Sequence, residues 1–402
     1  MKQAKRLLVT LCLAGVVLPA AAQQPIRIGD ISPYSALPQG TDGWRKGWEL
    51  AVEEINAAGG MLGGRKIEVL ARDDAGKPDV ATRMAQELVT NEKVDMLTGT
   101  IFSHIGVAIA DFAGRNKIFF LASQPLTDSI IWEKGNRYTF RLRPSTYTQT
   151  IALVEEAAKL PAKRWATIAP NYEYGQSAVA SFKAALRAKR PDVEFVAEQW
   201  PALGKLEAGS TVQALSAAKP DAIFNVTFGA DLARLAREGN TRGLFANRLV
   251  VSLLTGEPEY LDPLKDDAPK GWIVTGYPWE QIKTPEHSKF LAAYQKKFRE
   301  TPKIGSIIGY VNMQAITAII RKAGSLDPEN LIAATRGLTF DSAMGPISFR
   351  PQDHQSTMGV YIGKLDVKDG RGMMVDWKYV DGKGLQGDDA FVKSKRPAEA
   401  MK

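Results

Sequence analysis

Hydrophobic positions along most of the chain alternate between two spacings. Short apolar runs, typical of buried strands, are separated by stretches in which apolar residues recur at helical spacing. The predicted strands cover 26–31, 66–71, 94–98 and 118–121 in a first series, and 165–169, 193–198, 222–228 and 249–254 in a second. The predicted helices cover 44–55, 80–89, 105–112, 176–187, 212–217 and 232–237. Strands separated by helices in this way predict parallel sheets with helices on both faces.

Breaks in this pattern predict how the chain is divided. The segment 141–145 separates the two series, and 276–279 precedes a mainly helical stretch at 286–336. A third break near Gly345-Pro346 precedes two terminal strands, predicted at 361–367 and 373–380. We expect two α/β lobes, with the chain crossing between them at these breaks. Lobe I comprises 23–143 and 278–345, and lobe II comprises 144–277 and 346–385. Residues 386–402 are expected to form a loose polar tail.

The N-terminus has the order of regions found in a secretory leader. Residues 1–6 are cationic, residues 7–18 form an apolar run, and small residues surround Ala22. The apolar run is too short to span a bilayer, which needs about 20 residues. We therefore predict a signal peptide at 1–22, cleaved between Ala22 and Gln23, and export of the remaining chain. The only cysteine, Cys12, lies in this segment, so no disulfide is expected in the mature protein.

Composition and charge are those of a globular protein. Hydrophobic residues make up 45% of the chain and charged residues 24%. The formal charge of +8 falls to +5 without the basic residues of the leader, and the remaining basic residues are mixed with acidic ones. This pattern disfavours a nucleic-acid partner. The most apolar later segment, 304–320, is interrupted by Gly, Ser, Asn and Gln, so we expect a soluble mature protein.

The predicted sheets indicate where a ligand would bind. Ligands of open parallel sheets lie beyond the carboxyl ends of the strands, and two such lobes facing each other form a cleft that can close. The first-lobe loops at 32–43, 98–104 and 122–127 are the candidates. Ser103 directly precedes a predicted helix, so its hydroxyl and the first-turn amides can hold a carboxylate. A role as helix N-cap alone is the alternative for Ser103.

Several short segments, in order and spacing, resemble one family. They are 54–60 (Glu-Ile-Asn-Ala-Ala-Gly-Gly), 73–78 (Asp-Asp-Ala-Gly-Lys-Pro), Gly99 with Ser103, 121–123 (Leu-Ala-Ser) with Thr127, and 172–175 (Tyr-Glu-Tyr-Gly). Together they resemble the periplasmic solute-binding proteins of branched-chain amino acid type ABC transporters, over residues 26 to about 380. The resemblance implies a type I periplasmic binding protein: two Rossmann-like α/β lobes, each a parallel-sheet sandwich, joined by three hinge crossovers.

The resemblance also implies a binding site between the lobes. In the first lobe a ligand carboxylate would be held by Ser103, Thr127 and the amides around Ile101 and Phe102, with Ala122, Ser123 and Leu126 in the same loops. In the second lobe, Tyr174 would pack on the ligand and the turn Phe228-Gly229-Ala230 would contact it. Glu257 is either the partner of a ligand ammonium group or part of an ordinary loop. Tyr34 and Tyr277 are further aromatic candidates near the cleft loops and the hinge.

Two departures from the family pattern bear on the ligand. A cystine found near the first-lobe site of some members is absent, because Gly76 and Phe102 occupy its positions. The segment 344–355 resembles a branch whose members bind amides, urea and aromatic acids as well as amino acids. The ligand therefore stays open among amino acids, aromatic acids and amides.

The expected function is that of the substrate-binding component of an ABC importer, with a small-molecule ligand and a membrane permease as partners, no cofactor and a monomeric state. A sensor of the same fold, presenting its ligand to a receptor, is the alternative.

Ser103, His104 and Asp111 contain the residue types of a catalytic triad, but adjacent residues on a turn point apart, so no catalytic residue is predicted. His104, His287 and His354 lack metal-site spacing and are expected on the surface or in loops.

Overall fold

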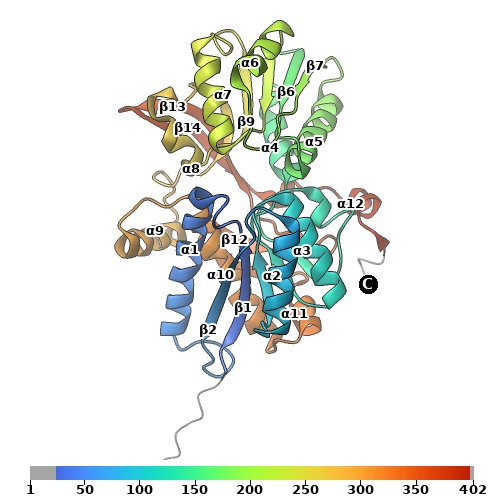
Figure 1. The fold of residues 1–402 in the computed structure, drawn as a ribbon, viewed down its shortest axis with the longest axis vertical. Helices are drawn as coiled ribbons and strands as arrows, with labels where there is room; N and C mark the ends of the chain where they lie inside the picture. Colours follow the sequence, from blue (N-terminus) through green and yellow to red (C-terminus); the bar gives the residue numbers. More distant parts are fainter. Residues whose placement is uncertain (1–23, 399–402) are drawn as a thin grey trace, which may run out of the picture.

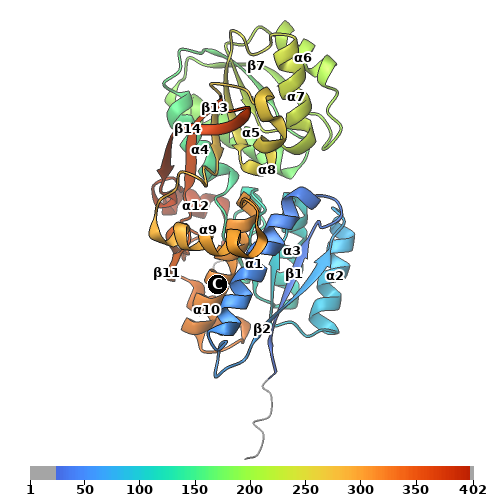
Figure 2. The ribbon, with the colours of Figure 1, turned by 90° about the vertical axis from the view of Figure 1, so that its left-hand side faces the viewer.

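The structure is a computed structural model, and it describes residues 24–398. Two α/β lobes lie one above the other along the long axis of the molecule, with the hinge segments and the end of the chain along one side (Figures 1 and 2). The predicted signal peptide at 1–22 and Cys12 lie outside the described residues. The two-lobed fold expected from the sequence is confirmed.

The first lobe is built on a five-stranded parallel sheet with the order β2-β1-β3-β4-β5. Its strands are β1 (Ile26–Ser32), β2 (Ile67–Asp73), β3 (Met96–Gly99), β4 (Phe120–Ala122) and β5 (Thr139–Arg141). Its helices are α1 (Pro38–Ala57), α2 (Pro78–Thr90), α3 (Ser103–Asn116), α9 (Pro285–Phe298), α10 (Ile304–Ala323) and α11 (Pro328–Thr335), with the short 3-10 helix η1 (Asp128–Ile130) after β4. Helix α1 starts earlier than the apolar pattern predicts, because Pro38 occupies its first turn.

The second lobe is built on a seven-stranded sheet with the order β14-β13-β10-β9-β8-β6-β7. Its strands are β6 (Arg164–Ile168), β7 (Glu194–Gln199), β8 (Ala222–Asn225), β9 (Leu249–Gly256), β10 (Ile273–Gly276), β13 (Val360–Lys368) and β14 (Arg371–Val380). Its helices are α4 (Thr146–Ala157), α5 (Glu173–Lys189), α6 (Ala208–Ala217), α7 (Gly229–Thr241) and α8 (Pro258–Leu261), followed by η2 (Asp262–Asp267). The sheet is parallel except at one edge, where β13 runs antiparallel to both β10 and β14.

Helix α10 is a core helix of the first lobe. Of the described helices it is the one long and apolar enough to cross a membrane, but 83% of its apolar stretch is buried inside the protein. Glycines bring its backbone against that of α1: a Cβ added to Gly309 would lie 2.3 Å from the carbonyl oxygen of Trp44. The glycines that interrupt this apolar segment therefore serve close helix packing.

The chain passes between the lobes three times, after β5, after β10 and before β13. The third passage was expected near Gly345-Pro346, and this position is wrong. The strand β12 (Gly345–Ser348) pairs with β11 (Thr339–Ser342) in a hairpin beside α10. Gln355 then forms a bridge with Arg141 at the edge of the first sheet. The chain therefore enters the second lobe between Gln355 and the start of β13.

The expectation of a loose polar tail at 386–402 is also wrong for its described part. The tail forms α12 (Asp389–Lys395), where the Asp388 side chain accepts a hydrogen bond from the Phe391 amide at 2.8 Å. The Phe391 ring stacks on Tyr147, with 5.2 Å between ring centroids. The Arg396 guanidinium is buried and donates to the Ile131 carbonyl at 2.6 Å. These tertiary contacts hold a segment whose composition alone indicates exposure.

Two of the three histidines are buried: His354 lies in a loop, one of the two expected positions, whereas His287 lies within α9, against the expectation. His354 is 1% exposed and stacks on Phe140 with 3.9 Å between centroids. His287 is fully buried in α9, and burial lowers its pKa to about 4. Burial also lowers the pKa of His354 well below its usual value. Both side chains are therefore neutral parts of the packing at neutral pH.

Candidate functional site

The first-lobe half of the candidate site joins the loops that follow β3 and β4. Ser103 is the first residue of α3, and Phe102 occupies the N-cap. The Ser103 hydroxyl accepts hydrogen bonds from the backbone amides of Leu126, at 3.3 Å, and Thr127, at 3.2 Å. The alternative of a simple N-cap is therefore wrong, because the side chain bonds across to the neighbouring loop. Its proton stays free to be donated to a ligand.

Thr127 lies where the two lobes meet. Its hydroxyl accepts from the Ser129 amide at 3.3 Å and donates to a carboxylate oxygen of Glu173 at 2.8 Å. The Ser129 hydroxyl donates to the same oxygen at 2.5 Å. Glu173 is the first residue of α5, so it belongs to the second lobe. The Thr127 hydroxyl, which the family resemblance implies as a partner of a ligand carboxylate, is therefore bonded here to a carboxylate of the chain itself.

Gly76 and Phe102, the residues at the positions of the missing cystine, are neighbours. A Cβ added to Gly76 would lie 3.4 Å from the Phe102 ring. The ring faces second-lobe Tyr172, with 6.4 Å between centroids in an edge-on arrangement. His104 also meets Tyr172 edge-on, at 5.4 Å. Phe102 thus brings apolar surface to the boundary between the lobes.

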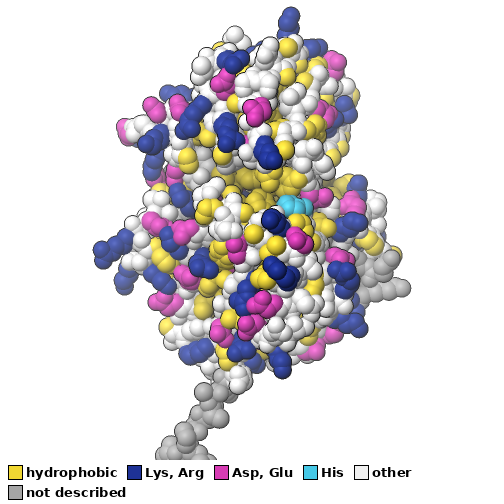
Figure 3. Space-filling view, viewed as in Figure 1, with side chains coloured by type: hydrophobic (Ala, Val, Ile, Leu, Met, Phe, Trp, Pro, Cys, Tyr) yellow, Lys and Arg dark blue, Asp and Glu magenta, His cyan; other side chains and the backbone are white. Residues whose placement is uncertain are grey.

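The second-lobe half is aromatic. Tyr174, the second residue of α5, packs edge-on against Phe228, the N-cap of α7, with 5.8 Å between centroids. Phe228 in turn lies 5.8 Å from Tyr260, and Tyr172 lies 6.1 Å from Tyr174. We call the six rings at this boundary the interlobe aromatic cluster: Phe102, His104, Tyr172, Tyr174, Phe228 and Tyr260. The space-filling view shows hydrophobic side chains gathered at the waist between the lobes (Figure 3).

Beside this cluster lies a buried hydrogen bond between a guanidinium group and a carboxyl group. Arg143 donates from Nη2 to Oε1 of Glu257, the N-cap of α8. The second oxygen, Oε2, has no hydrogen-bond partner among residues 24–398, and neither does the Tyr174 hydroxyl. Burial raises the pKa of Glu257 to about 8, although Arg143 lowers it, and nearby Glu259 raises it further. Burial also raises the pKa of Tyr174 well above its usual value, so its hydroxyl stays neutral.

The other predicted site residues lie in several different environments. Ser123 is fully buried and hydrogen-bonded to Asn312 Oδ1 at 2.8 Å, which ties β4 to α10. Tyr34 donates to the buried carboxylate of Asp30. The Tyr277 hydroxyl pairs with His287 Nε2 at 2.7 Å, away from the aromatic cluster. Ala122 ends β4, Ile101 and Leu126 lie in the first-lobe loops, and Gly229 and Ala230 open α7, with Ala230 exposed.

Four residues at this boundary were not predicted as site residues: Arg143, Tyr172, Glu173 and Tyr260. Tyr172 and Glu173 follow β6, and Arg143 follows β5, so each lies beyond the carboxyl end of a strand. Ligands of parallel sheets bind beyond the carboxyl ends of the strands, so Arg143, Tyr172 and Glu173 could have been predicted from their positions in the sequence. Tyr260 lies within α8, and its place in the cluster depends on the tertiary fold.

Comparison with known proteins identifies the family. The family model for periplasmic binding proteins matches residues 25–371. A Brucella suis protein named "Leu/Ile/Val-binding protein homolog 7" is 27% identical over 339 residues, which cover 80% of this chain and 83% of that protein. A Pseudomonas aeruginosa leucine-, isoleucine-, valine-, threonine- and alanine-binding protein is 23% identical over 346 residues, which cover 86% and 91%.

Solved structures with the same fold come from ABC transporter solute-binding proteins. One from Rhodopseudomonas palustris, in complex with 3,4-dihydroxybenzoic acid, has a TM-score of 0.79 and 26% identity over 90% of this chain and 98% of that one. An amino acid ABC transporter substrate-binding protein from Pseudomonas fluorescens has a TM-score of 0.81 and 23% identity, with 92% and 98% covered. Proteins similar to this chain thus bind amino acids or aromatic acids.

Proposed function

Because the chain belongs to the periplasmic binding protein family, we propose that it is the exported substrate-binding component of an ABC importer. It closes its two lobes over a small amino acid or a related carboxylate or amide, and it delivers this solute unchanged to a permease in the inner membrane. The observation that supports this most is the boundary between the lobes, where the first-lobe hydroxyl of Thr127 bonds to second-lobe Glu173 and the Phe102 ring meets second-lobe Tyr172. Such a surface binds a polar head group at one end and an apolar body at the other.

Within that class, the contacts around Glu257 favour an acid without an amine over an amino acid. Glu257 already accepts from Arg143, and burial holds its pKa at about 8, so at neutral pH its carboxyl is mainly protonated. A protonated carboxyl is a poor partner for an ammonium group, whereas Arg143 offers a buried cation to a carboxylate. The similar R. palustris protein holds an aromatic acid, which agrees with this preference.

A ligand screen tests the proposal. A solute that binds only the folded state raises the melting temperature, so the mature protein is screened by thermal shift against amino acids, aromatic acids and amides. Leucine and phenylalanine are each paired with the α-keto acid of the same carbon skeleton, which isolates the effect of the amine. Calorimetry then gives the affinity, and chromatography of the recovered ligand checks that it is unchanged. If no class shifts the melting temperature, the transport role is wrong.

A sensor of the same fold is the alternative function. Both proteins would bind the solute, so the screen does not separate them. Uptake of the identified solute by proteoliposomes that contain the cognate permease does: a shuttle is required for uptake, and a sensor is not. The cleavage between Ala22 and Gln23 and the periplasmic location are checked by N-terminal sequencing of the protein from a periplasmic extract.

Thr127→Val is expected to weaken binding of the identified solute about ten- to hundredfold, because in this proposal a ligand carboxylate replaces Glu173 as the acceptor of the Thr127 hydroxyl, and valine removes that hydrogen bond while keeping the shape of the side chain. Calorimetry measures the change. The matched control is Thr335→Val, a fully buried threonine in α11 whose hydroxyl bonds to the Leu331 carbonyl at 2.7 Å. Equal affinities of Thr127→Val and the unmodified protein would remove Thr127 from the site.

A further inference from the structure

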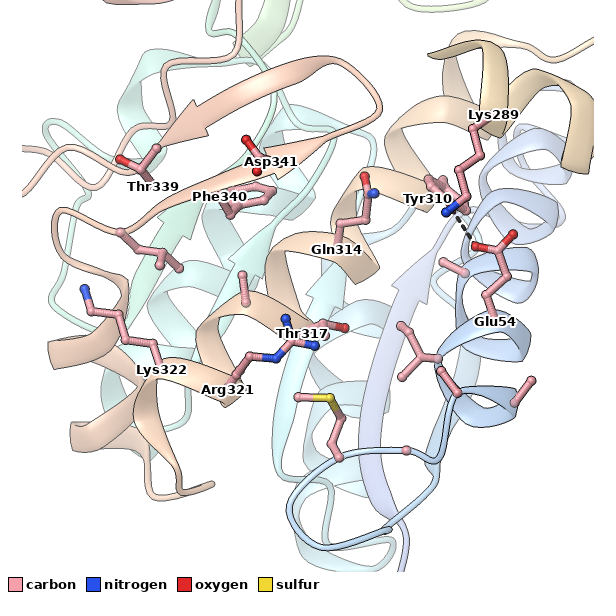
Figure 4. Close-up of a pocket in the computed structure, with 18 residues that line it drawn as sticks. Glu54, Lys289, Tyr310, Gln314, Thr317, Arg321, Lys322, Thr339, Phe340 and Asp341 are labelled. Atoms are coloured by element: carbon pink, nitrogen blue, oxygen red, sulfur yellow. Dashed lines mark hydrogen bonds between the residues drawn. The ribbon is translucent and has the colours of Figure 1, made fainter. Parts of the chain in front are cut away.

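A cavity lies on the side of the first lobe, between α1, α10 and the hairpin strand β11 (Figure 4). We call it the lateral groove. Its volume is about 1010 Å³, at the upper end of the range for small-molecule sites. It contains none of the six residues of the interlobe aromatic cluster, so it is separate from the candidate transport site.

The floor of the lateral groove is a polar stripe along α10. Tyr310, Gln314, Thr317 and Arg321 all line the groove, and their spacing of four, three and four residues puts them on one face of the helix. The rest of α10 is mainly apolar core. At about 1.5 Å per residue the stripe is roughly 16 Å long. This face of α10 thus presents a row of hydrogen-bonding groups to the groove, whereas Asn312 of the same helix bonds to Ser123 in the core.

Part of this hydrogen-bonding capacity is unused. Thr317 is 9% exposed, and its hydroxyl has no partner among the described residues. Gln314 accepts from the Ala343 amide at 3.0 Å, and the described part of the chain offers no acceptor for its NH₂ group. Tyr310 is satisfied, since it donates to Glu54 at 2.6 Å. A buried hydroxyl without a partner is costly unless something else bonds to it.

The charges in the groove favour an anion at one end. Near Tyr310, exposed Lys289 accompanies Glu54, as the close-up shows (Figure 4). At the other end of the stripe, Arg321 has no ion pair or hydrogen bond with any residue in the range 24–398, and Figure 4 shows its side chain directed toward Thr317. A guanidinium group matches the geometry of a carboxylate with two parallel hydrogen bonds. Thr317 and Arg321 are four residues apart on α10, so the unpaired hydroxyl and the unpaired cation lie on the same face of the helix.

The walls of the groove are apolar in part, although β11 also brings Thr339 and Asp341 to the lining. Ala51 and Ile55 of α1, with Met61 after it, form one wall, and Leu338 and Phe340 at β11 form the other. An anion alone would leave these walls in contact with water. A molecule that carries one carboxylate on an elongated hydrocarbon body fits both the cation and the walls.

We propose that the lateral groove is a second ligand site, which binds a monocarboxylate with an elongated apolar body. The carboxylate lies against Arg321 and Thr317, and the body lies between the α1 wall and Phe340. This inference is independent of the transport function, because it involves no residue at the boundary between the lobes.

The test uses the mature protein, octanoate as the probe, and NMR of ¹³C-labelled alanine methyl groups. Ala51, Ala58 and Ala318 report on the groove, and Ala122 reports on the first-lobe loops of the transport site. We expect saturable shifts of the three groove methyls at a Kd of about 1 mM or below, which is typical of a small ligand with one ion pair. Arg321→Gln is expected to weaken binding about tenfold, and Thr317→Val severalfold.

The charge-matched control is Lys296→Gln, an exposed residue of α9 that does not line the groove, and its affinity for octanoate should be unchanged. Thr317→Val keeps the shape of the side chain and removes a hydroxyl without a described partner, so it should fold normally. Shifts confined to Ala122, shifts that do not saturate, or equal affinity of Arg321→Gln and the unmodified protein would each overturn the proposal.

Discussion

Arg141→Met is expected to lower the free energy of unfolding by about 3–5 kcal/mol, because it removes a fully buried cation on which several other buried groups depend. Arg141 donates from Nε to the Gln355 side chain at 2.6 Å and from Nη1 to the carbonyl oxygens of Leu126 and Thr127. A methionine of similar length fills the space but leaves these acceptors without a donor. Urea unfolding followed by circular dichroism measures the loss.

The matched control for this prediction is Arg115→Met. Arg115 pairs with Asp111 on α3 at 2.8 Å, but both side chains are more than half exposed. Its replacement should change stability by about 0.5 kcal/mol or less, as for other surface pairs. If the two variants lost similar stability, the buried hydrogen bonds of Arg141 would contribute no more to stability than a surface ion pair does. A selective loss should also weaken ligand binding, since Arg141 fixes the loop that carries Thr127.

Glu257→Gln is expected to make the protein more stable than the unmodified form at pH 9, by about 2–4 kcal/mol, and to leave its stability at pH 5 nearly unchanged. Burial raises the pKa of Glu257 to about 8 in the folded protein, above the usual value of 4.5. The folded state therefore binds a proton that the unfolded state has released. Stability from this group is complete below about pH 4.5 and is lost as the pH rises through 8. Gln mimics the protonated carboxyl and cannot ionise.

Urea unfolding of both proteins between pH 5 and 9 measures the effect. Burial also raises the pKa of Asp30 to about 6 and that of Asp74 to about 7. These groups change stability in the same direction, but they are present in both proteins, so the difference between the two curves isolates Glu257. Parallel curves would show that Glu257 is ionised in the folded state. An ionised Glu257 could pair with a ligand ammonium group, so an acid without an amine would no longer be favoured.

The fold was predictable because its signals are local. The spacing of apolar residues marks nearly every strand of the first lobe, including β1, β2 and β3, within one or two residues of the observed bounds. The short strand β5 and helix α4 were missed. β5 has only three residues, and α4 is a helix in which buried threonines and Gln149 replace an obvious apolar stripe.

The candidate site was predictable in part. The sequence indicated the loops of Ser103 and Thr127, and the structure joins them through hydrogen bonds of the Ser103 hydroxyl. It did not indicate that Glu173 bonds to Thr127, or that Phe102 meets Tyr172, because these partners are 46 and 70 residues apart in the chain. A ligand role for Tyr277 stays a prediction, although its hydroxyl already pairs with His287.

The sequence by itself determined the alternation of strands and helices, the division into two lobes and the loops from which a site can be built, since each of these depends on neighbouring residues and on the general behaviour of parallel sheets. Only the tertiary structure decided where the chain crosses for the third time, that α12 packs against Tyr147, and that Glu257 pairs with Arg143 with a pKa near 8. The reason is physical: burial and pairing depend on which distant segments come together, and desolvation acts on a group only after they have done so.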